Sequence, residues 1–166
     1  MAAPVEESST LPSMKLIGVY DANGTLTGEI AYGLGLLIGK SCALCKVTHT
    51  LLGGGKSTFN ELAKKHFTRQ SFGGNLVWEE ATTGTSSSAT LPPIELELVH
   101  LDERSPECTA YTEDKGSCVV LLRDPVKEPA SFELVFSTED LKAMGGGEEQ
   151  FFVELEKKFK EMGILK

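Results

Sequence analysis

Two cysteines and a histidine lie close together in the chain, in the spacing Cys42-x-x-Cys45-x-x-x-His49. Two sulfurs at this separation can close the small disulfide ring used in thiol redox chemistry, and they can also bind one metal ion. Two thiols that are merely packed or exposed show the same spacing, and this plain interpretation carries the most weight. Cys42 and Cys45 are therefore candidate catalytic residues and candidate metal ligands.

His49 would supply a third metal ligand, and a Cys/Cys/His set is typical of tetrahedral zinc sites. A bound water in the fourth position would leave the zinc open for catalysis. The protein residues that could fill that position instead are Cys108, Cys118, His66 and His100. A strand histidine bonded to a backbone group is the competing interpretation of His49, and the sequence slightly favours it.

A glycine-rich segment, Gly53-Gly-Gly-Lys-Ser-Thr58, opens a predicted helix. Backbone N–H groups at a helix start attract anions and Lys56 would add positive charge, so Lys56 is a candidate ligand-binding residue for phosphate. A P-loop requires Gly-x-x-x-x-Gly-Lys-Ser/Thr, and Thr50 stands where its first glycine should be. A plain loop leading into a helix capped by Thr58 and Glu61 is the favoured interpretation.

The hydrophobic pattern predicts strands alternating with helices. The strands are expected at 14–20, 46–52, 94–101, 118–122 and 132–136, the last with Phe132, Leu134 and Phe136 on one face. The helices are expected at 30–38, from Thr58 through Phe67, after an N-cap at Ser105, at 138–144 and at 148–162. A hairpin through Asn23 and Gly24 competes with the helix at 30–38, residues 68–75 are expected to be loop, and 76–78 start a further short element.

The second half of this pattern reads strand, short helix, strand, strand, helix. Together with the leading strand and helix, it resembles the thioredoxin-like arrangement, so we expect an α/β fold with a small central mixed sheet flanked by helices. In thioredoxins the Cys-x-x-Cys motif directly follows the first strand. Here Cys42 lies beyond a whole predicted element, and that spacing counts against the redox interpretation.

One domain is expected over residues 14–166. Residues 1–13 are expected to be a disordered tail, because they contain prolines and acids and neither the basic cluster nor the apolar run of a targeting signal. The Ser/Thr-rich stretch at 79–93 is predicted to be a flexible surface loop within the domain.

The chain has 166 residues and a formal net charge of −8. Negative charge repels phosphate backbones and anionic lipids, and no apolar run approaches the roughly 18 residues that span a bilayer. We therefore expect a cytoplasmic protein that binds neither nucleic acid nor membrane. In a reducing compartment, its four cysteines are more readily thiols, metal ligands or transient redox pairs than permanent disulfides.

The segment Leu16-Ile-Gly-Val-Tyr-Asp-Ala-Asn-Gly24, followed by Cys42-Ala-Leu-Cys45 and Thr48-His49, resembles a family of small, mostly bacterial proteins of unassigned function. The shared features are a Tyr-Asx-Ala start after the first strand, a Cys-x-Leu-Cys beyond a helix, and a Thr-His or Thr-Tyr pair. The likeness is specific between Leu16 and His49 and loose thereafter. It implies that Asp21 and Asn23 share one ligand-binding site with Cys42, Cys45 and His49, near the end of the first strand.

Three hypotheses follow from these patterns. The first is a metal-binding (zinc) or thiol-redox site at Cys42, Cys45 and His49, and whether it catalyses a reaction stays open. The second is a non-enzymatic binding or adaptor protein with a protein partner, which the Ser/Thr-rich loop and the missing catalytic signature favour. The third and weakest is binding of a phosphate ligand through residues 53–56.

Overall fold

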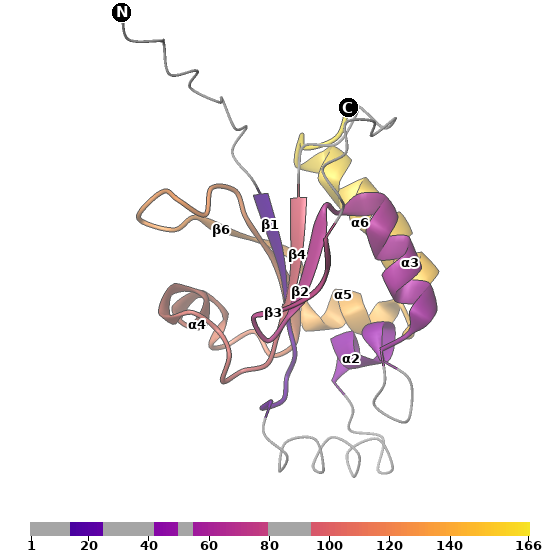
Figure 1. Ribbon diagram of the computed structural model, residues 1–166, viewed down its shortest axis with the longest axis horizontal. Coiled ribbons are helices and arrows are strands. Elements are labelled where there is room, and N and C mark those ends of the chain that lie inside the picture. Colours follow the sequence, from indigo (N-terminus) through magenta and orange to yellow (C-terminus); the bar gives the residue numbers. More distant parts are fainter. Residues whose placement is uncertain (1–13, 25–41, 50–54, 80–93) are drawn as a thin grey trace, which may run out of the picture.

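A mixed six-stranded sheet forms the centre of the protein (Figure 1). The computed structural model describes residues 14–24, 42–49, 55–79 and 94–166. The strands are β1 (Met14–Val19), β2 (Arg69–Phe72), β3 (Asn75–Glu79), β4 (Ile94–Val99), β5 (Cys118–Leu122) and β6 (Phe132–Phe136). The helices are α2 (Ala43–Thr48), α3 (Ser57–His66), α4 (Pro106–Thr112), α5 (Thr138–Ala143) and α6 (Glu148–Glu161).

The strand order is β3-β2-β4-β1-β5-β6, with β1 near the middle. Strand β1 runs parallel to β4 and antiparallel to β5, and β2 runs parallel to β4. The flanking strands β3 and β6 each pair antiparallel with their neighbours. The carboxyl ends of the three parallel strands β1, β2 and β4 therefore meet at one edge of the sheet, where α/β proteins commonly place their sites.

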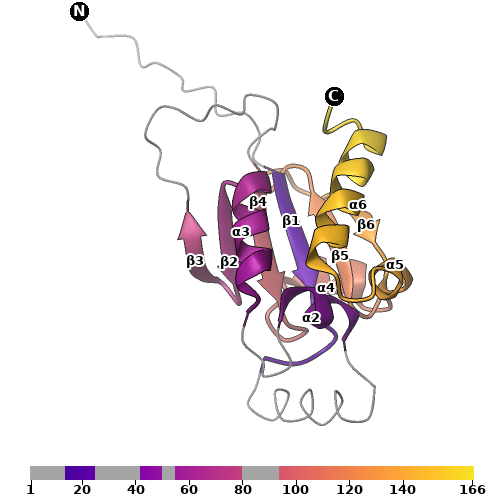
Figure 2. The same ribbon diagram turned by 90° about the vertical axis from the view of Figure 1, so that its right-hand side faces the viewer.

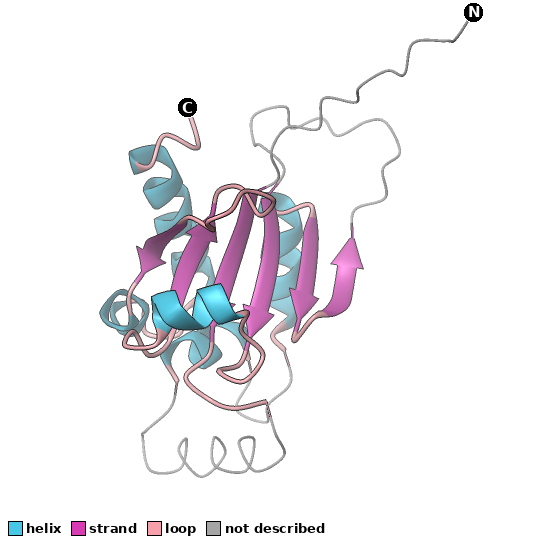
Figure 3. Cartoon of the chain, turned by 90° about the vertical axis from the view of Figure 1, so that its left-hand side faces the viewer, coloured by secondary structure: helices cyan, strands magenta, loops and turns pink. Residues whose placement is uncertain are grey.

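Two hydrophobic clusters cover the two faces of the sheet. Helices α2, α3, α5 and α6 pack on one face, where Leu16, Leu96 and Leu121 of adjacent strands form the buried layer (Figure 2). Helix α4 packs on the other face, over Ile17 and Val120 (Figure 3). The α/β class with a mixed sheet flanked by helices is thus confirmed.

Gly18 lets the first face pack tightly at the centre of β1. A Cβ added there would lie 2.7 Å from Leu98 Cδ2 and 3.0 Å from Leu44 Cδ2. A Cβ there would overlap the Leu98 methyl and press on the Leu44 methyl, so both side chains would have to shift to admit it. The absence of a side chain at Gly18 therefore leaves room for Leu44 of α2 close to the strand.

Several predicted elements are confirmed, namely the strands at β1, β4, β5 and β6, the helices at α3, α5 and α6, and the start of α4 at an N-cap Ser105 followed by Pro106. The short element expected at 76–78 is β3. The predicted helix at 30–38, the tail at 1–13 and nearly all of the Ser/Thr-rich stretch lie outside the described residues. Within the described ranges, no helix combines the length and the apolar character needed to cross a membrane.

Two predicted segments are wrong. Residues 46–48, the start of the strand expected at 46–52, belong to helix α2 instead, because Ala43, Leu44 and Val47 are all buried against the sheet and the side chain of Cys42 caps the helix. Residues 69–72, expected to be loop, form β2, whose Gln70 is buried between two strands. A prediction based on hydrophobicity misses this strand, because its buried residue, Gln70, is polar.

Two smaller predictions are also wrong. Thr58 and Glu61 do not form a capping box, because the N-cap of α3 is Lys56, two residues before Thr58, and Thr58 donates instead to Glu148. In β6, Leu134 is 41% exposed, while its neighbour Val135 is buried. A register shift opposite Val119 and Val120 breaks the simple alternation of faces there.

The packing of Leu121 gives a direct test of this fold. Its side chain is fully buried at the centre of the sheet, so Leu121→Ala should lower the free energy of unfolding by about 2–5 kcal/mol. Val126→Ala is the matched control, because Val126 is 89% exposed and its truncation should change stability by less than about 0.5 kcal/mol. Urea unfolding of both variants makes the comparison, and equal stabilities would contradict this strand arrangement.

Candidate functional site

Cys42 and Cys45 lie together at the start of α2. Cys42 is the N-cap residue, and its Sγ accepts a hydrogen bond from the backbone N–H of Cys45 at 3.3 Å. A second backbone hydrogen bond to Cys42 comes from Asp21, the second residue after β1. The motif therefore lies at the carboxyl end of the first strand after all, and the long sequence separation does not count against redox chemistry.

The surroundings of the two thiols shift their pKa values in opposite directions. The pKa of Cys42 falls to about 7, chiefly because the side chain of Cys45 donates a hydrogen bond to it, with further help from backbone hydrogen bonds and against the effect of burial. The pKa of Cys45 is raised, first by that same hydrogen bond, then by burial and by the negative charges of Cys42 and Asp21. At neutral pH these shifts leave Cys42 partly ionised while Cys45 keeps its proton, an asymmetry that suits thiol exchange.

The other two cysteines lie on the opposite face of the sheet. Cys108 on α4 and Cys118 at the start of β5 are buried in the cluster beneath α4. Burial raises the pKa of Cys118 to about 11 and raises that of Cys108 as well. Both have the character of structural thiols, and neither belongs to the hydrophobic cluster that contains Cys42 and Cys45.

An aromatic cluster occupies the same sheet edge. Tyr20 follows β1, Phe72 ends β2 and His100 follows β4, so the three parallel strands each contribute one ring. The ring centroids of Tyr20 lie 5.8 Å from Phe72 and 5.3 Å from His100. His49, at the C-terminal end of α2, packs edge-on against Tyr20 at 5.4 Å and contacts Phe72 at 5.8 Å.

His49 is neutral in this setting. Burial lowers its pKa, and the nearby His100 lowers it further. Its Nδ1 is hydrogen-bonded to Thr48 Oγ1 at 2.7 Å, and Thr48 Oγ1 also lies 2.9 Å from the hydroxyl of Tyr20. A neutral imidazole held through one nitrogen has its other nitrogen available to a ligand.

The predicted zinc ligands occupy two ends of α2. Cys42 caps the N-terminus and His49 the C-terminus of a helix that spans about 9 Å. Across the described ranges, no group of three or more His, Cys, Asp or Glu side chains is placed to hold a metal ion. Zinc binding by Cys42, Cys45 and His49 stays a prediction.

The loop after β1 brings Asp21 to the thiols and is fastened to the loop after β4. Asp102 Oδ1 accepts the backbone N–H of Gly24 at 2.7 Å, and this hydrogen bond lowers the pKa of Asp102. The backbone N–H of Leu101 donates to the carbonyl of Ala22 at 2.9 Å. Of the two residues that the resemblance adds to the site, Asp21 is thus beside the cysteines, and Asn23 is exposed in the loop that follows.

Lys56 lies away from the thiols and is held by an acidic partner. Its Nζ donates to the carbonyl of Gly146 at 2.8 Å and to Glu148 Oε2 at 3.0 Å. Hydrogen bonds from Thr58 and Lys56 and the N-terminus of α6 lower the pKa of Glu148 to about 2. A phosphate at Lys56 would have to displace this carboxylate, so the arrangement does not favour the phosphate prediction.

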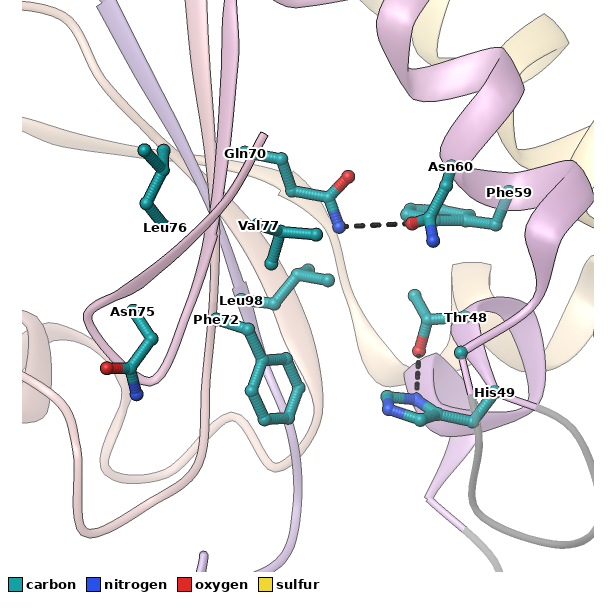
Figure 4. A pocket seen from close by; sticks show the side chains of 11 residues that line it. Thr48, His49, Phe59, Asn60, Gln70, Phe72, Asn75, Leu76, Val77 and Leu98 are labelled. Atoms are coloured by element: carbon teal, nitrogen blue, oxygen red, sulfur yellow. Dashed lines mark hydrogen bonds between the residues drawn. The ribbon is translucent and has the colours of Figure 1, made fainter. Parts of the chain in front are cut away.

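A pocket of about 400 Å³ opens beside the aromatic cluster, between α3 and the β2–β3 hairpin (Figure 4). His49 and Phe72 belong to both the pocket and the aromatic cluster, and Asn60 and Gln70 add carboxamides to the pocket wall. Sequence reasoning missed this site because its residues are dispersed over α2, α3 and three strands. Among the lining residues, only His49 was a candidate site residue in the sequence.

No protein-family model, no curated protein and no solved structure matches this chain. The resemblance to a family of small proteins therefore stays a prediction, and the site has to be interpreted from its own chemistry.

The thiol asymmetry predicts selective reactivity at neutral pH. In the wild-type protein, the rate of iodoacetamide alkylation at Cys42 should rise with a midpoint near pH 7, and Cys108 and Cys118 should react far more slowly. Cys45→Ala removes the largest cause of the shift, so the midpoint at Cys42 should move toward the ordinary value of 9.0. Peptide-level mass spectrometry follows each thiol separately, and a wild-type midpoint near that ordinary value would contradict the described geometry.

The contact between α3 and α6 predicts a pH dependence of stability. Folding lowers the pKa of the Glu148 carboxyl from 4.5 to about 2. The ionised carboxylate therefore stabilises the fold fully above pH 4.5, and this stabilisation is lost as the pH falls from 4.5 to about 2. Glu148→Gln should lower stability at neutral pH by about 1 kcal/mol and flatten this acid dependence.

Glu149→Gln is the matched control for this experiment, since Glu149 occupies the same first turn of α6 and is exposed. Urea unfolding at neutral pH and at about pH 3 makes the comparison. The same acid dependence in Glu148→Gln and the wild type would rule out this role for the carboxylate.

Proposed function

We propose that the protein carries out thiol–disulfide exchange, with Cys42 as the attacking thiol and Cys45 as the resolving thiol. The observation that carries this proposal is the placement of the two thiols at the start of α2, where Cys42 Sγ accepts the backbone N–H of Cys45 at 3.3 Å, and the opposite pKa shifts of the two cysteines agree with it. A pKa near ambient pH suits an attacking thiol, because it gives a high thiolate fraction without weakening the nucleophile.

The reaction has two exchange steps. The Cys42 thiolate attacks one sulfur of a substrate disulfide, so that a mixed disulfide forms, the substrate S–S bond breaks and its other sulfur leaves as a thiolate. Cys45 then gives up its proton to solvent and attacks Cys42 Sγ. The Cys42–Cys45 bond forms, the second substrate thiolate leaves, and two electrons have passed from the protein to the substrate disulfide.

The order of events follows from the charges on the site. While Cys42 is a thiolate, its negative charge and that of Asp21 keep Cys45 protonated. Formation of the mixed disulfide removes the charge on Cys42 and the acceptor of the Cys45 hydrogen bond. The hydrogen bond to Cys42 and the repulsion by its negative charge, which both keep Cys45 protonated, are thus lost in the same step. Cys45 can then lose its proton, so the resolving step follows the first attack.

The sheet supports the same proposal. The order β4-β1-β5-β6, with β4 parallel and β5 antiparallel to β1, fits the thioredoxin-like arrangement that the sequence predicts. The thiol pair starts a helix at the carboxyl end of β1, the strand that the other strands flank. The negative net charge of −8 slows encounters with anionic disulfides such as oxidised glutathione without preventing exchange at equilibrium, so we infer that the natural disulfide partner is neutral or basic.

Exchange with glutathione buffers tests the proposal. Across buffers of increasing oxidised glutathione, the wild-type protein should lose two hydrogens as the Cys42–Cys45 disulfide forms. Cys45→Ser should instead accumulate a glutathione adduct on Cys42, because the resolving thiol is missing, and Cys42→Ser should form neither product. Alkylation followed by peptide mass spectrometry reports all three species.

Cys108→Ser is the matched control, and it should behave as the wild type because Cys108 is buried on the other face. Failure to form the Cys42–Cys45 disulfide in the most oxidising buffer would refute the proposal. Stoichiometric zinc in protein purified without chelator, lost in both Cys42→Ser and Cys45→Ser, would favour the metal hypothesis instead.

A further inference from the structure

The pocket beside His49 combines apolar walls with fixed polar groups. Its exposed apolar surface comes chiefly from Leu76 and Val77 of β3 and from Phe72, while the buried Phe59 and Leu98 lie at its floor. Its volume of about 400 Å³ is within the range of small-molecule sites. Among the described residues that line it there is no Lys, Arg, Asp or Glu, so a charged ligand would enter without a counter-ion.

A chain of hydrogen bonds sets the orientation of the pocket carboxamides. The indole Nε1–H of Trp78 can only donate, and it donates to Gln70 Oε1 at 2.8 Å. Gln70 must therefore present its Nε2 toward α3, where it donates to Asn60 Oδ1 at 3.3 Å. Because the Asn60 oxygen is used in this way, its two Nδ2 hydrogens point away from Gln70.

Those hydrogens face the pocket. Figure 4 shows the Asn60 amide nitrogen directed toward the side on which Thr48 and His49 lie. Within the part of the chain that the structure describes, Asn60 Nδ2 donates no hydrogen bond to another residue. Asn60 thus offers fixed donors, and His49, tied to Thr48 through Nδ1, offers its second ring nitrogen across the same space.

We propose that this pocket binds an uncharged small molecule with a planar apolar body and a carbonyl group. The planar body would pack against the ring of Phe72 and the exposed side chain of Val77, and the carbonyl oxygen would accept from Asn60 Nδ2. This site is separate from the thiol pair, because neither Cys42 nor Cys45 lines the pocket. It does not rest on the exchange activity proposed above.

Benzamide is the probe that matches this description, and benzoate is the same ring with a negative charge. Titration of benzamide into isotope-labelled protein should shift the side-chain amide resonances of Asn60 and Gln70 and leave those of Gln150, on α6, unchanged. Benzoate should bind at least about tenfold more weakly, since no cation in the lining compensates its charge. Equal affinity for the two probes, or no shift at Asn60, would overturn the proposal.

Asn60→Asp is the sharpest variant, because it keeps the oxygen that accepts from Gln70 and removes the donors that face the pocket. It should weaken benzamide binding at least about tenfold. Gln150→Glu adds the same negative charge elsewhere and should bind as the wild type. If Asn60→Asp binds benzamide unchanged, the carbonyl contact is wrong.

Cys42→Ser should bind benzamide with wild-type affinity while losing disulfide exchange, which separates the two sites. If Asn60→Asp fails to fold, the amide shifts in the wild-type protein and the benzoate comparison still decide the matter.

Discussion

The hydrogen bond from the Cys45 backbone N–H to Cys42 Sγ is the interaction on which the site depends. It supplies an acceptor for one of the N–H groups that every helix start leaves unpaired. It also stabilises negative charge on the sulfur, because a hydrogen bond to an ionised acceptor is stronger than one to a neutral acceptor. The hydrogen bond that caps α2 thus adds to the effect of the Cys45 side chain, which is the largest cause of the low pKa of Cys42.

Helix α2 is too short to be stable alone and depends on the sheet for its stability. Isolated helices of this length do not persist in water, so the six residues of α2 are held by burial of their apolar side chains. Leu44 is fully buried and reaches the backbone of β1 where Gly18 leaves room for it. The packing of Leu44 at Gly18 therefore helps to hold α2, which carries both thiols, against β1.

The sequence predicts the strongly patterned elements and fails where polar residues are buried or β-branched residues are helical. The runs at 118–122 and 148–162 are apolar or periodic enough to be identified without a structure. Val47 and Thr48 favour strands by propensity, yet burial of one face and capping by Cys42 make them helical. Strand β2 was not predicted, because Gln70 and Ser71 are polar. Its extended conformation is explained by its pairing with β3 and β4.

The candidate site was predictable only in part, for a related reason. Cys42, Cys45 and His49 are close in sequence, so their types and spacing identified them. Tyr20, Phe72 and His100 come together because the three parallel strands that carry them end at the same edge of the sheet. Which strands are neighbours depends on the strand order of the folded sheet, and no local sequence pattern predicts that order.

The two ends of α2 serve different chemistry, and the helix keeps them apart. Its N-terminus holds the thiol pair next to Asp21, where backbone N–H groups favour negative charge on sulfur. Its C-terminus holds Thr48 and His49, where a neutral imidazole faces a pocket lined by aromatic rings and carboxamides. A thiolate needs hydrogen-bond donors, and an uncharged ligand needs a wall without ions. One short, largely buried helix can meet both needs because its two ends differ in polarity.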